Sequence, residues 1–359
     1  MNTSFKKYLN QVLQAAVFYA IALVLWCLFR FYGIGQMGGI IVQQEYQQVM
    51  QVSNLLRLFF LSGILVGILF ATIGYVFDKF TSKRLSLGLV LFLKTGLYLL
   101  TLIVISTLAK LAINYRFGIQ INARETWYQD QTFLVTLLYV LLVSVVFQFL
   151  KIASDKFGKG VFLKMLLGKY KKPQEEKRIF MFLDLKSSTT IAEQLGHFKY
   201  SQLIQDCFYD LNAIVPKYSA EIYQYVGDEA VLSWPYAKGL ANNNCVKMYF
   251  EFASALKQKQ AYYLEKYNTV PVFKAGLHGG KLMVAEVGVV KKELAFHGDV
   301  INTSARIQSQ CNTYNVSILI SELLKDELPP LAQFSHTHMG NVLLKGKEHK
   351  LNIYAVESA

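Results

Sequence analysis

The chain contains few charged residues for a protein of its length. Asp, Glu, Lys and Arg make up only 17% of its 359 residues, whereas hydrophobic residues make up 53%. Soluble globular domains carry about 25% charged residues, so this composition excludes an ordinary soluble protein. The sequence therefore indicates a membrane part together with one or two folded domains.

Cysteine is also scarce, and the spacing of the cysteines excludes paired motifs. Cys27, Cys207, Cys245 and Cys311 form no Cys-x-x-Cys pair. Three of the four lie in the second half of the chain, which the charge pattern described below places in the cytosol. Because thiols are kept reduced there, we expect reduced, buried, structural cysteines.

The hydrophobic excess lies in the first half of the chain, in four apolar runs. Each run is close to the roughly 20 residues needed to span a bilayer. The runs cover residues 12–29, 55–77, 85–109 and 133–150. A buried core helix is the alternative for any single run, but four runs in succession with polar connectors favour four transmembrane helices.

Lys and Arg are absent from the connector 33–54, and their distribution elsewhere predicts the topology. Basic residues stand before the first run, between the second and the third, and after the fourth. Since cytoplasmic loops are rich in Lys and Arg, we expect a multi-pass protein of the inner (plasma) membrane with both termini and the second half in the cytoplasm. The connector that holds Arg116 and Arg124 fits less well. Lys94, within the third run, can be a buried functional charge, but its inner position favours a side chain that snorkels to the cytoplasmic face.

A basic segment follows the fourth run. Residues 151–178 hold nine basic residues and three acidic ones, in a chain with a net charge of +13. Nucleic acid is one partner for such a cluster, but its position directly after a membrane helix favours anionic cytoplasmic lipid, so we predict no nucleic-acid partner. The predicted organisation is a transmembrane anchor or sensor at 1–150, a basic juxtamembrane linker at 151–177 and a folded domain at 178–359.

The second half of the chain has the pattern of one soluble domain with strands and helices. Strands are expected at 179–185, on both sides of the turn in QYVGDEAVLSW (224–234), and at 272–280, 288–296, 316–321 and 351–356. Helices are expected at 187–196, 200–218, 244–267 and 300–310. Strand and helix do not alternate strictly, so we predict a mixed, largely antiparallel sheet covered by helices.

Two aspartates stand where adjacent strands would end. Asp184 ends the strand at 179–185, and Asp228 lies at the tip of a hairpin in which Gly227 can take the positive φ of a tight turn. If these strands are neighbours, both carboxylates reach one end of the sheet. That arrangement suits a pair of divalent ions, because Mg²⁺ and Mn²⁺ prefer oxygen ligands. The alternative is that Asp184 only caps a helix and Asp228 only makes a turn.

A third segment with chemical potential is the helix in GDVINTSARIQ. Asn302 and Arg306 are four residues apart and therefore share one helix face. An amide beside a guanidinium can orient a nucleotide and stabilise charge that develops on a phosphate. A solvated amphipathic helix is the alternative.

Together, these segments resemble the catalytic domain of class III adenylyl and guanylyl cyclases from Arg178 to Val356. FLDLKSST is similar to the first metal motif of that family, YVGDEAV to the second, HGDVINTSAR to the transition-state motif and LKGKEHKLNIYAV to the closing strand pair. The resemblance implies a ferredoxin-like, palm-type α+β fold. It also implies a homodimer in which the two metal aspartates of one chain face the transition-state helix of the other.

The resemblance implies roles for individual residues. Two Mg²⁺ or Mn²⁺ ions per site would be held by Asp184, the Leu185 carbonyl and Asp228, with Glu229 as a neighbour rather than a catalyst. Asn302 would orient the ribose, Arg306 would meet the α-phosphate and Lys345 would face the terminal phosphates. The implied reaction converts ATP to cyclic AMP and pyrophosphate by attack of the ribose 3′-hydroxyl on the α-phosphate.

Two nucleotide-binding positions depart from the usual pattern of the family. The Lys and the Asp or Thr that select adenine are replaced by Gln224 and Ala295. Gln224 can donate and accept hydrogen bonds but Ala295 cannot, so ATP is the expected substrate while GTP and pyrimidine nucleotides stay open. One rival function is a diguanylate cyclase, although the turn lacks the paired glycines of that family. The other is a membrane receptor whose cyclase-like domain binds nucleotide without activity.

Overall fold

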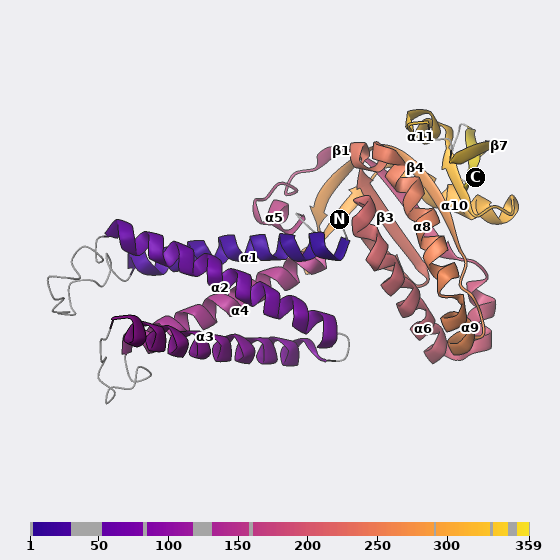
Figure 1. The fold of residues 1–359 in the computed structure, drawn as a ribbon. Helices are drawn as coiled ribbons and strands as arrows, with labels where there is room; N and C mark the ends of the chain where they lie inside the picture. The colour runs from indigo at the N-terminus through magenta and orange to yellow at the C-terminus, as the bar shows by residue number, and fades with distance from the viewer. Residues whose placement is uncertain are drawn as a thin grey trace. The chain divides into compact units, whose positions relative to one another are not determined.

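The computed structural model describes residues 3–29, 52–81, 85–117, 131–157, 161–290, 292–330, 333–343 and 350–358. The chain divides into two compact units, residues 1–156 and 157–359. Each unit has buried hydrophobic clusters of its own. Figure 1 shows the long helices of the first unit and the helix-covered sheet of the second.

The first unit consists of long apolar helices. They are α1 (Thr3–Leu28), α2 (Val52–Thr81), α3 (Leu87–Phe117) and α4 (Gln131–Phe157). Each contains a stretch long and apolar enough to cross a membrane, namely Tyr8–Leu28, Ser53–Phe80, Gly88–Leu108 and Leu134–Ser154. The prediction of four such helices is confirmed. Most of the connectors that carry the topology signal, residues 33–51, 82–84 and 118–130, lie outside the described residues, so the orientation stays a prediction.

Helices α1 and α2 approach each other at glycines. A Cβ added to Gly63 of α2 would lie 2.5 Å from the Cα of Ala20, and one added to Gly67 would lie 2.6 Å from the Cα of Ala16. Both distances are far shorter than a carbon contact, so the helix backbones themselves touch. Small residues spaced by four are typical of such close pairing between membrane helices.

We expect Gly67→Ala to lower the thermal stability of the full-length chain in detergent. The new methyl group would overlap the backbone of α1, and separating the helices costs about 1 to 3 kcal/mol. Gly96→Ala in α3 is the matched control, because no other part of the described chain lies within 4 Å of a Cβ there. The control should be neutral or slightly stabilising. Equal melting temperatures for the two variants would contradict the close packing of α1 on α2.

The lysine inside α3 is buried and paired, which corrects the expectation that it snorkels. Lys94 is 8% exposed, and its Nζ lies 2.5 Å from Oδ1 of Asp78 in α2. Nζ of Lys151 in α4 lies 3.4 Å from the other oxygen of the same carboxylate. Charges in an apolar bundle pair with one another inside the bundle because exposure to lipid is costly. These pairs therefore connect α2, α3 and α4.

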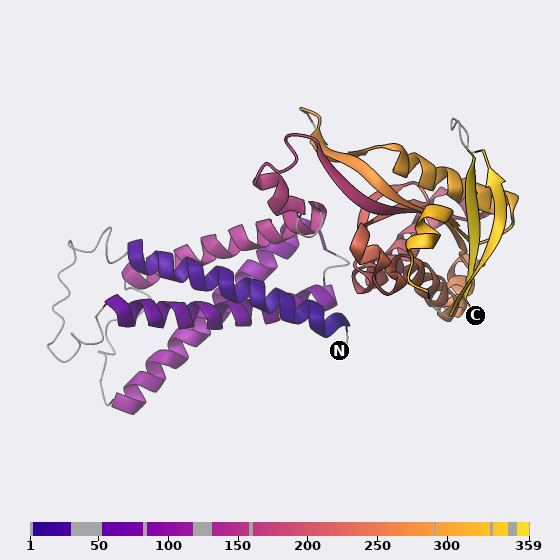
Figure 2. The same ribbon diagram turned by 90° about the horizontal axis from the view of Figure 1, so that it is seen from above.

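The second unit is an α+β domain built on a mixed sheet. Its strands are β1 (Gln174–Leu185), β2 (Glu221–Val226), β3 (Glu229–Pro235), β4 (Phe273–Val287), β5 (Glu293–His297), β6 (Ile318–Ser321), β7 (Phe334–Val342) and β8 (Leu351–Ser358). The order is β2-β3-β1-β4-β6-β8-β7, with β5 paired to β4. Strands β4 and β6 run parallel, and the other described pairs are antiparallel. The predicted sheet type is confirmed, and Figure 2 shows the long strands β1 and β4 side by side.

The alternation of side chains along β1 separates the two faces of the sheet. Ile179, Met181 and Leu183 join a large core cluster with residues of α6 (Ser188–Ile214), α8 (Asn244–Gln258) and α9 (Gln260–Tyr267), the three helices that Figure 1 shows next to one another. Phe180 and Phe182 join a second cluster with Val300 of α10 (Asp299–Thr313). We call this second side the α10 face.

The remaining helices are short, and two predicted helix boundaries differ from the structure. They are α5 (Val161–Leu166), η4 (Val215–Tyr218), α7 (Tyr236–Leu240), η5 (Ala241–Asn243) and α11 (Glu322–Glu327). The predicted helices at 187–196 and 200–218 lie within α6 and η4, and Gly196 interrupts α6 with φ 71° and ψ 162°, which glycine adopts readily. The predicted helix at 244–267 divides into α8 and α9. All four cysteines are free and buried, as predicted.

Candidate active site

The two predicted metal aspartates lie at one end of the sheet. Strands β1 and β3 are antiparallel neighbours, and their register pairs Asp184 with Glu229. Asp228 stands next to Glu229 in the turn between β2 and β3, where Gly227 has a φ of 59°. Asp184 alternates with the core residues Leu183 and Leu185, so its side chain lies on the α10 face.

The electrostatics of this end of the sheet favour a bound cation. Oδ2 of Asp228 is buried and has no hydrogen-bond partner within the described part of the chain. Burial, and then the charge of Asp228, raise the pKa of Asp184, although Lys274 and Gln308 act in the opposite direction. Burial, and then the charges of Asp184 and Asp228, raise the pKa of Glu229 to about 7. Three half-buried acids that repel one another would all be stabilised in their ionised forms by a nearby positive ion.

Two polar side chains that sequence reasoning missed hold Asp184. Gln308 of α10 donates a hydrogen bond from Nε2 to Oδ2 of Asp184 at 3.1 Å. Nζ of Lys274, which is 5% exposed, lies 3.7 Å from the same oxygen and donates a hydrogen bond to Asn312 at 2.7 Å. A lysine within the apolar strand pattern VFKAGL was the available signal, because a buried lysine needs an acidic or polar partner.

Gly276 brings α10 close enough for the Gln308 contact. A Cβ added to this residue of β4 would lie 2.1 Å from the backbone N of Gln308. Strand β4 and helix α10 are therefore in backbone contact, and a glycine in the interior of a strand is typical of such an approach. The position of α10 relative to Asp184 therefore depends on the absence of a Cβ atom at Gly276.

Asn302 and Arg306 turn away from the aspartates of their own chain. The face of α10 that packs on the sheet is formed by Val300, Thr303, Ser304, Ile307, Gln308 and Cys311. At 3.6 residues per turn, Arg306 lies about 200° and Asn302 about 240° around the helix from Gln308. Accordingly, Asn302 is exposed and Arg306 half-buried. Within the described residues, neither forms a hydrogen bond with Asp184 or Asp228.

Gln224 and Ala295, the positions predicted to read the base, lie on two strands whose adjacent aromatic residues are in contact. Gln224 is exposed on β2 next to a register shift, and Ala295 lies on β5 opposite Ala285. The rings of Tyr223 and Phe296, one residue from each, are 4.9 Å apart with a T-shaped geometry. Lys345, predicted to face the terminal phosphates, lies outside the described residues.

The donor set suits hard divalent ions that share substrate oxygens. Among the described residues, no group of three His, Cys, Asp and Glu side chains is arranged to hold a metal by itself. Asp184, Asp228 and the backbone carbonyl of Leu185 offer oxygen ligands of the kind that Mg²⁺ and Mn²⁺ prefer. The buried Oδ2 of Asp228, which has no hydrogen-bond partner among the described residues, is consistent with a ligand of such an ion.

Comparisons with known proteins agree with this geometry. The chain is 34% identical over 220 residues to Adenylate cyclase 2 of Rhizobium meliloti (strain 1021), a match that covers 61% of each protein. It is 23% identical over 175 residues to the receptor-type guanylate cyclase gcy-4 of Caenorhabditis briggsae, covering 46% of this chain and 15% of that one. The chain thus spans less than two thirds of the length of these relatives.

One solved structure and one family pattern are also similar to this chain. The structure of a bacterial light-regulated adenylyl cyclase shares the fold, with a TM-score of 0.54 and 18% identity over 64% of this chain and 67% of that one. The family pattern described as Adenylate and Guanylate cyclase catalytic domain matches residues 170–358. That match covers more than half of the chain, Asp184, Asp228 and α10 included, and the protein therefore belongs to the adenylate and guanylate cyclase family.

Proposed function

We propose that the protein is a membrane-bound nucleotidyl cyclase that converts ATP to 3′,5′-cyclic AMP and pyrophosphate, and so produces a second messenger at the cytoplasmic face of the inner membrane. The observation that carries the proposal is the pair Asp184 and Asp228 at one end of the sheet, where a buried carboxylate oxygen finds no partner among the residues that the structure describes. The relative called Adenylate cyclase 2 supports ATP as the substrate. The apolar helices of the first unit support a membrane location.

Two Mg²⁺ or Mn²⁺ ions per site fit the residues present. Asp184, Asp228 and the Leu185 carbonyl would hold them. When bound, the ions would lower the pKa of the ribose 3′-hydroxyl and neutralise the triphosphate. Gln308 and Lys274 fix the Asp184 carboxylate, so this ligand is oriented before an ion arrives.

Asn302 and Arg306 would serve the site of a second copy of the chain. In the reaction, the ribose 3′-hydroxyl gives up its proton to water, a bond forms between O3′ and the α-phosphorus, the bond from that phosphorus to the oxygen bridging to the β-phosphate breaks, and pyrophosphate leaves. Arg306 would neutralise charge on the α-phosphate, and Asn302 would orient the ribose. Both turn away from the aspartates of their own chain, since Gln308 occupies the helix face that contacts Asp184. A symmetric dimer would bring them to the partner's aspartates, and Lys345 of one chain would face the terminal phosphates.

GTP is the second candidate substrate, on the strength of Gln224 and Ala295. The first is an exposed amide that can either donate or accept, and the second offers no hydrogen bond through its side chain. An enzyme discriminates against the wrong purine when that base leaves polar groups of the site without hydrogen-bond partners. A site without a charged pair has few such groups and therefore discriminates poorly. Several guanylate cyclases also match this chain, at 23–24% identity.

The purified full-length chain should form a cyclic product from ATP with only modest preference over GTP. Incubation with each of the four ribonucleoside triphosphates and Mn²⁺, followed by chromatography of the products, measures this directly. Restoring the usual residues with Gln224→Lys and Ala295→Asp should raise the ATP preference by about tenfold to a hundredfold. A strong preference that Gln224→Ala leaves unchanged would mean that other residues read the base. If the folded chain binds nucleotide but forms no cyclic product, the alternative of a membrane receptor with an inactive cyclase-like domain would be favoured.

Gly276→Ala should lower the rate of nucleotide cyclisation, although the new methyl group would not contact the substrate. Its methyl group would overlap the Gln308 backbone and displace α10. A shift of about 1 Å in a positioning element can cost up to about a hundredfold in rate. Gly96→Ala in α3 is the control, because no other part of the described chain lies within 4 Å of a Cβ there. If both variants cyclise nucleotide equally well, the backbone contact does not set the position of the helix.

A further inference from the structure

The segment between the last apolar helix and the sheet carries an unpartnered apolar surface. Leu163, Leu166 and Leu167, here called the leucine patch, are 60%, 64% and 78% exposed. They are spaced by three and four residues, and the N–H of Leu167 still bonds to the carbonyl of Leu163 at 3.0 Å. All three side chains therefore lie on one side of α5. Met165, on the opposite side, packs against the cluster of the α10 face.

Exposed lysines lie close to the leucine patch in the sequence. Lys164, Lys171 and Lys172 are exposed, and Lys169 is half exposed at 46% of its side chain. The nearest described acids of this segment are already paired, Glu176 with Lys169 and Arg178, and Glu175 with Lys281. The surface around the leucines thus has an excess of positive charge. Apolar side chains rimmed by lysines are typical of segments that lie in an anionic membrane interface.

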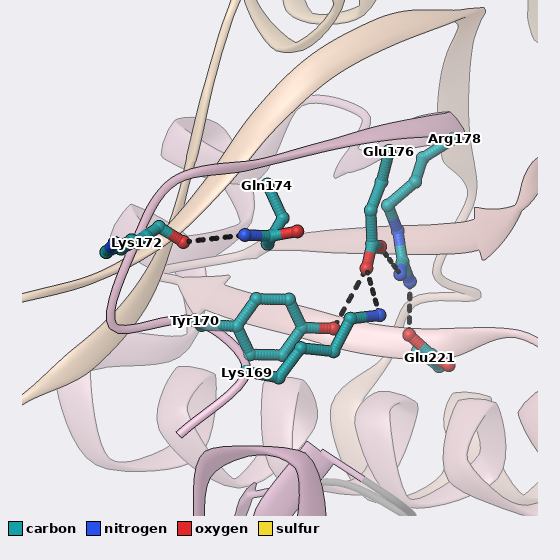
Figure 3. Close-up of polar contacts among 7 residues, drawn as sticks. All are labelled: Lys169, Tyr170, Lys172, Gln174, Glu176, Arg178 and Glu221. Atoms are coloured by element: carbon teal, nitrogen blue, oxygen red, sulfur yellow. Dashed lines mark hydrogen bonds and ion pairs between the residues drawn. The ribbon is translucent and has the colours of Figure 1, made fainter. Parts of the chain in front are cut away.

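The segment is fixed to the catalytic domain. Tyr170 is 2% exposed, its carbonyl accepts a hydrogen bond from the N–H of Glu286 at 2.9 Å, and its hydroxyl donates to Glu176 at 2.9 Å. Figure 3 shows how Glu176 then joins Arg178, which in turn pairs with Glu221 of β2. These contacts hold α5 with its leucines pointing away from the sheet, so the domain itself leaves the patch uncovered.

We propose that the leucine patch and its lysines dock on a membrane surface that contains anionic lipid. The last apolar span ends at Ser154 and α5 begins at Val161. Seven residues reach at most about 25 Å even when fully extended, so the patch cannot move far from the bilayer in which that span ends. The leucines would enter the boundary between headgroups and acyl chains, and the lysines would contact lipid phosphates. The proposal adds a membrane contact to the catalytic domain and does not depend on which nucleotide the site cyclises.

A spin label at Leu166→Cys in the full-length chain tests the docking. The four native cysteines are buried, so the new thiol is labelled selectively. The chain is reconstituted in nanodiscs of phosphatidylcholine alone, and of equal parts phosphatidylcholine and phosphatidylglycerol. In the anionic discs we expect the label to be accessible to oxygen and protected from a water-soluble nickel chelate. Leu167→Cys provides a second position, and Phe198→Cys, at an exposed site of α6, is the water-accessible control.

Charge reversal separates the lipid headgroups from other occupants. Lys164→Glu, Lys171→Glu and Lys172→Glu together should lower the partition of the label into the anionic interface by about a hundredfold or more, because each lysine near such a surface contributes about fivefold. The same change at the exposed Lys199, Lys238 and Lys257 should leave the label protected. Nickel accessibility equal to that of the Phe198 label in both lipids would overturn the proposal. Protection of the label from nickel that is the same in both lipids and unchanged by the lysine reversal would also overturn it. Spin–spin broadening between two copies would overturn it as well, because the patch would then be a contact between chains.

Discussion

Asp228→Asn should abolish cyclic nucleotide formation while the metal-free chain becomes more stable. The amide keeps the shape of the carboxylate but loses the charge that binds a divalent ion. Removal of a residue behind the ligands typically costs 10-fold to 100-fold, so loss of a ligand should cost at least about a hundredfold. Stability should rise by about 1 kcal/mol, because Asp184 and Glu229 lose a like-charged neighbour in a half-buried site.

Asp206→Asn is the matched control for the loss of activity and gain of stability expected of Asp228→Asn. Burial alone would raise the pKa of Asp206, but hydrogen bonds from Lys266, Tyr267 and Tyr262 outweigh it and leave the pKa below its ordinary value. This carboxylate of α6 is therefore stabilised as an anion, and the amide should destabilise the fold by about 1 kcal/mol while folded protein stays active. Thermal melts without metal and cyclase assays with Mn²⁺ measure both variants. Near-normal activity of Asp228→Asn would mean that Asp228 serves only to form the hairpin turn.

Co-expressed Asp184→Ala and Arg306→Ala chains should recover about a quarter of the wild-type activity, and the purified mixed dimers about half. Each variant alone should be inactive, because both of its sites contain the same lesion. If α10 of one chain completes the site of the other, a mixed dimer gathers both lesions in one site and leaves the second site intact. With random pairing, about half of the dimers are mixed and each has one working site of two. Co-expression with two different affinity tags isolates the mixed species for assay.

Asp184→Ala combined with Asp228→Asn is the control pairing. Both lesions remove metal ligands, so every mixed dimer has one defect in each site and no activity should return. Recovery with this pair as well would point to residual activity of the variants rather than to shared sites. No recovery with Asp184→Ala and Arg306→Ala, in confirmed mixed dimers, would place Arg306 in the site of its own chain and remove the support that the orientation of α10 gives to the dimer.

Local patterns in the sequence determined the elements of this protein. Runs of about 20 apolar residues predict helices long enough to cross a membrane, and the four runs correspond to α1 to α4. The run IFMFLDL alternates between two buried faces in β1, and the turn at Gly227 follows from the backbone freedom of glycine. Spacing by four put Asn302 and Arg306 on one helix face. Each of these conclusions depends only on residues close together in the chain.

Tertiary structure alone decided which distant residues meet. Gln308 and Lys274 converge on Asp184 from positions 124 and 90 residues away, and Gly276 sets the distance between β4 and α10. The partner of Lys94 proved to be Asp78 on another helix, which no periodicity in α3 encodes. The exposure of the leucine patch likewise depends on the burial of Tyr170 against the sheet. Periodicity reports which face of an element is buried, whereas the partner on that face is chosen by packing among elements far apart in sequence, and so the composition of the site required the folded chain.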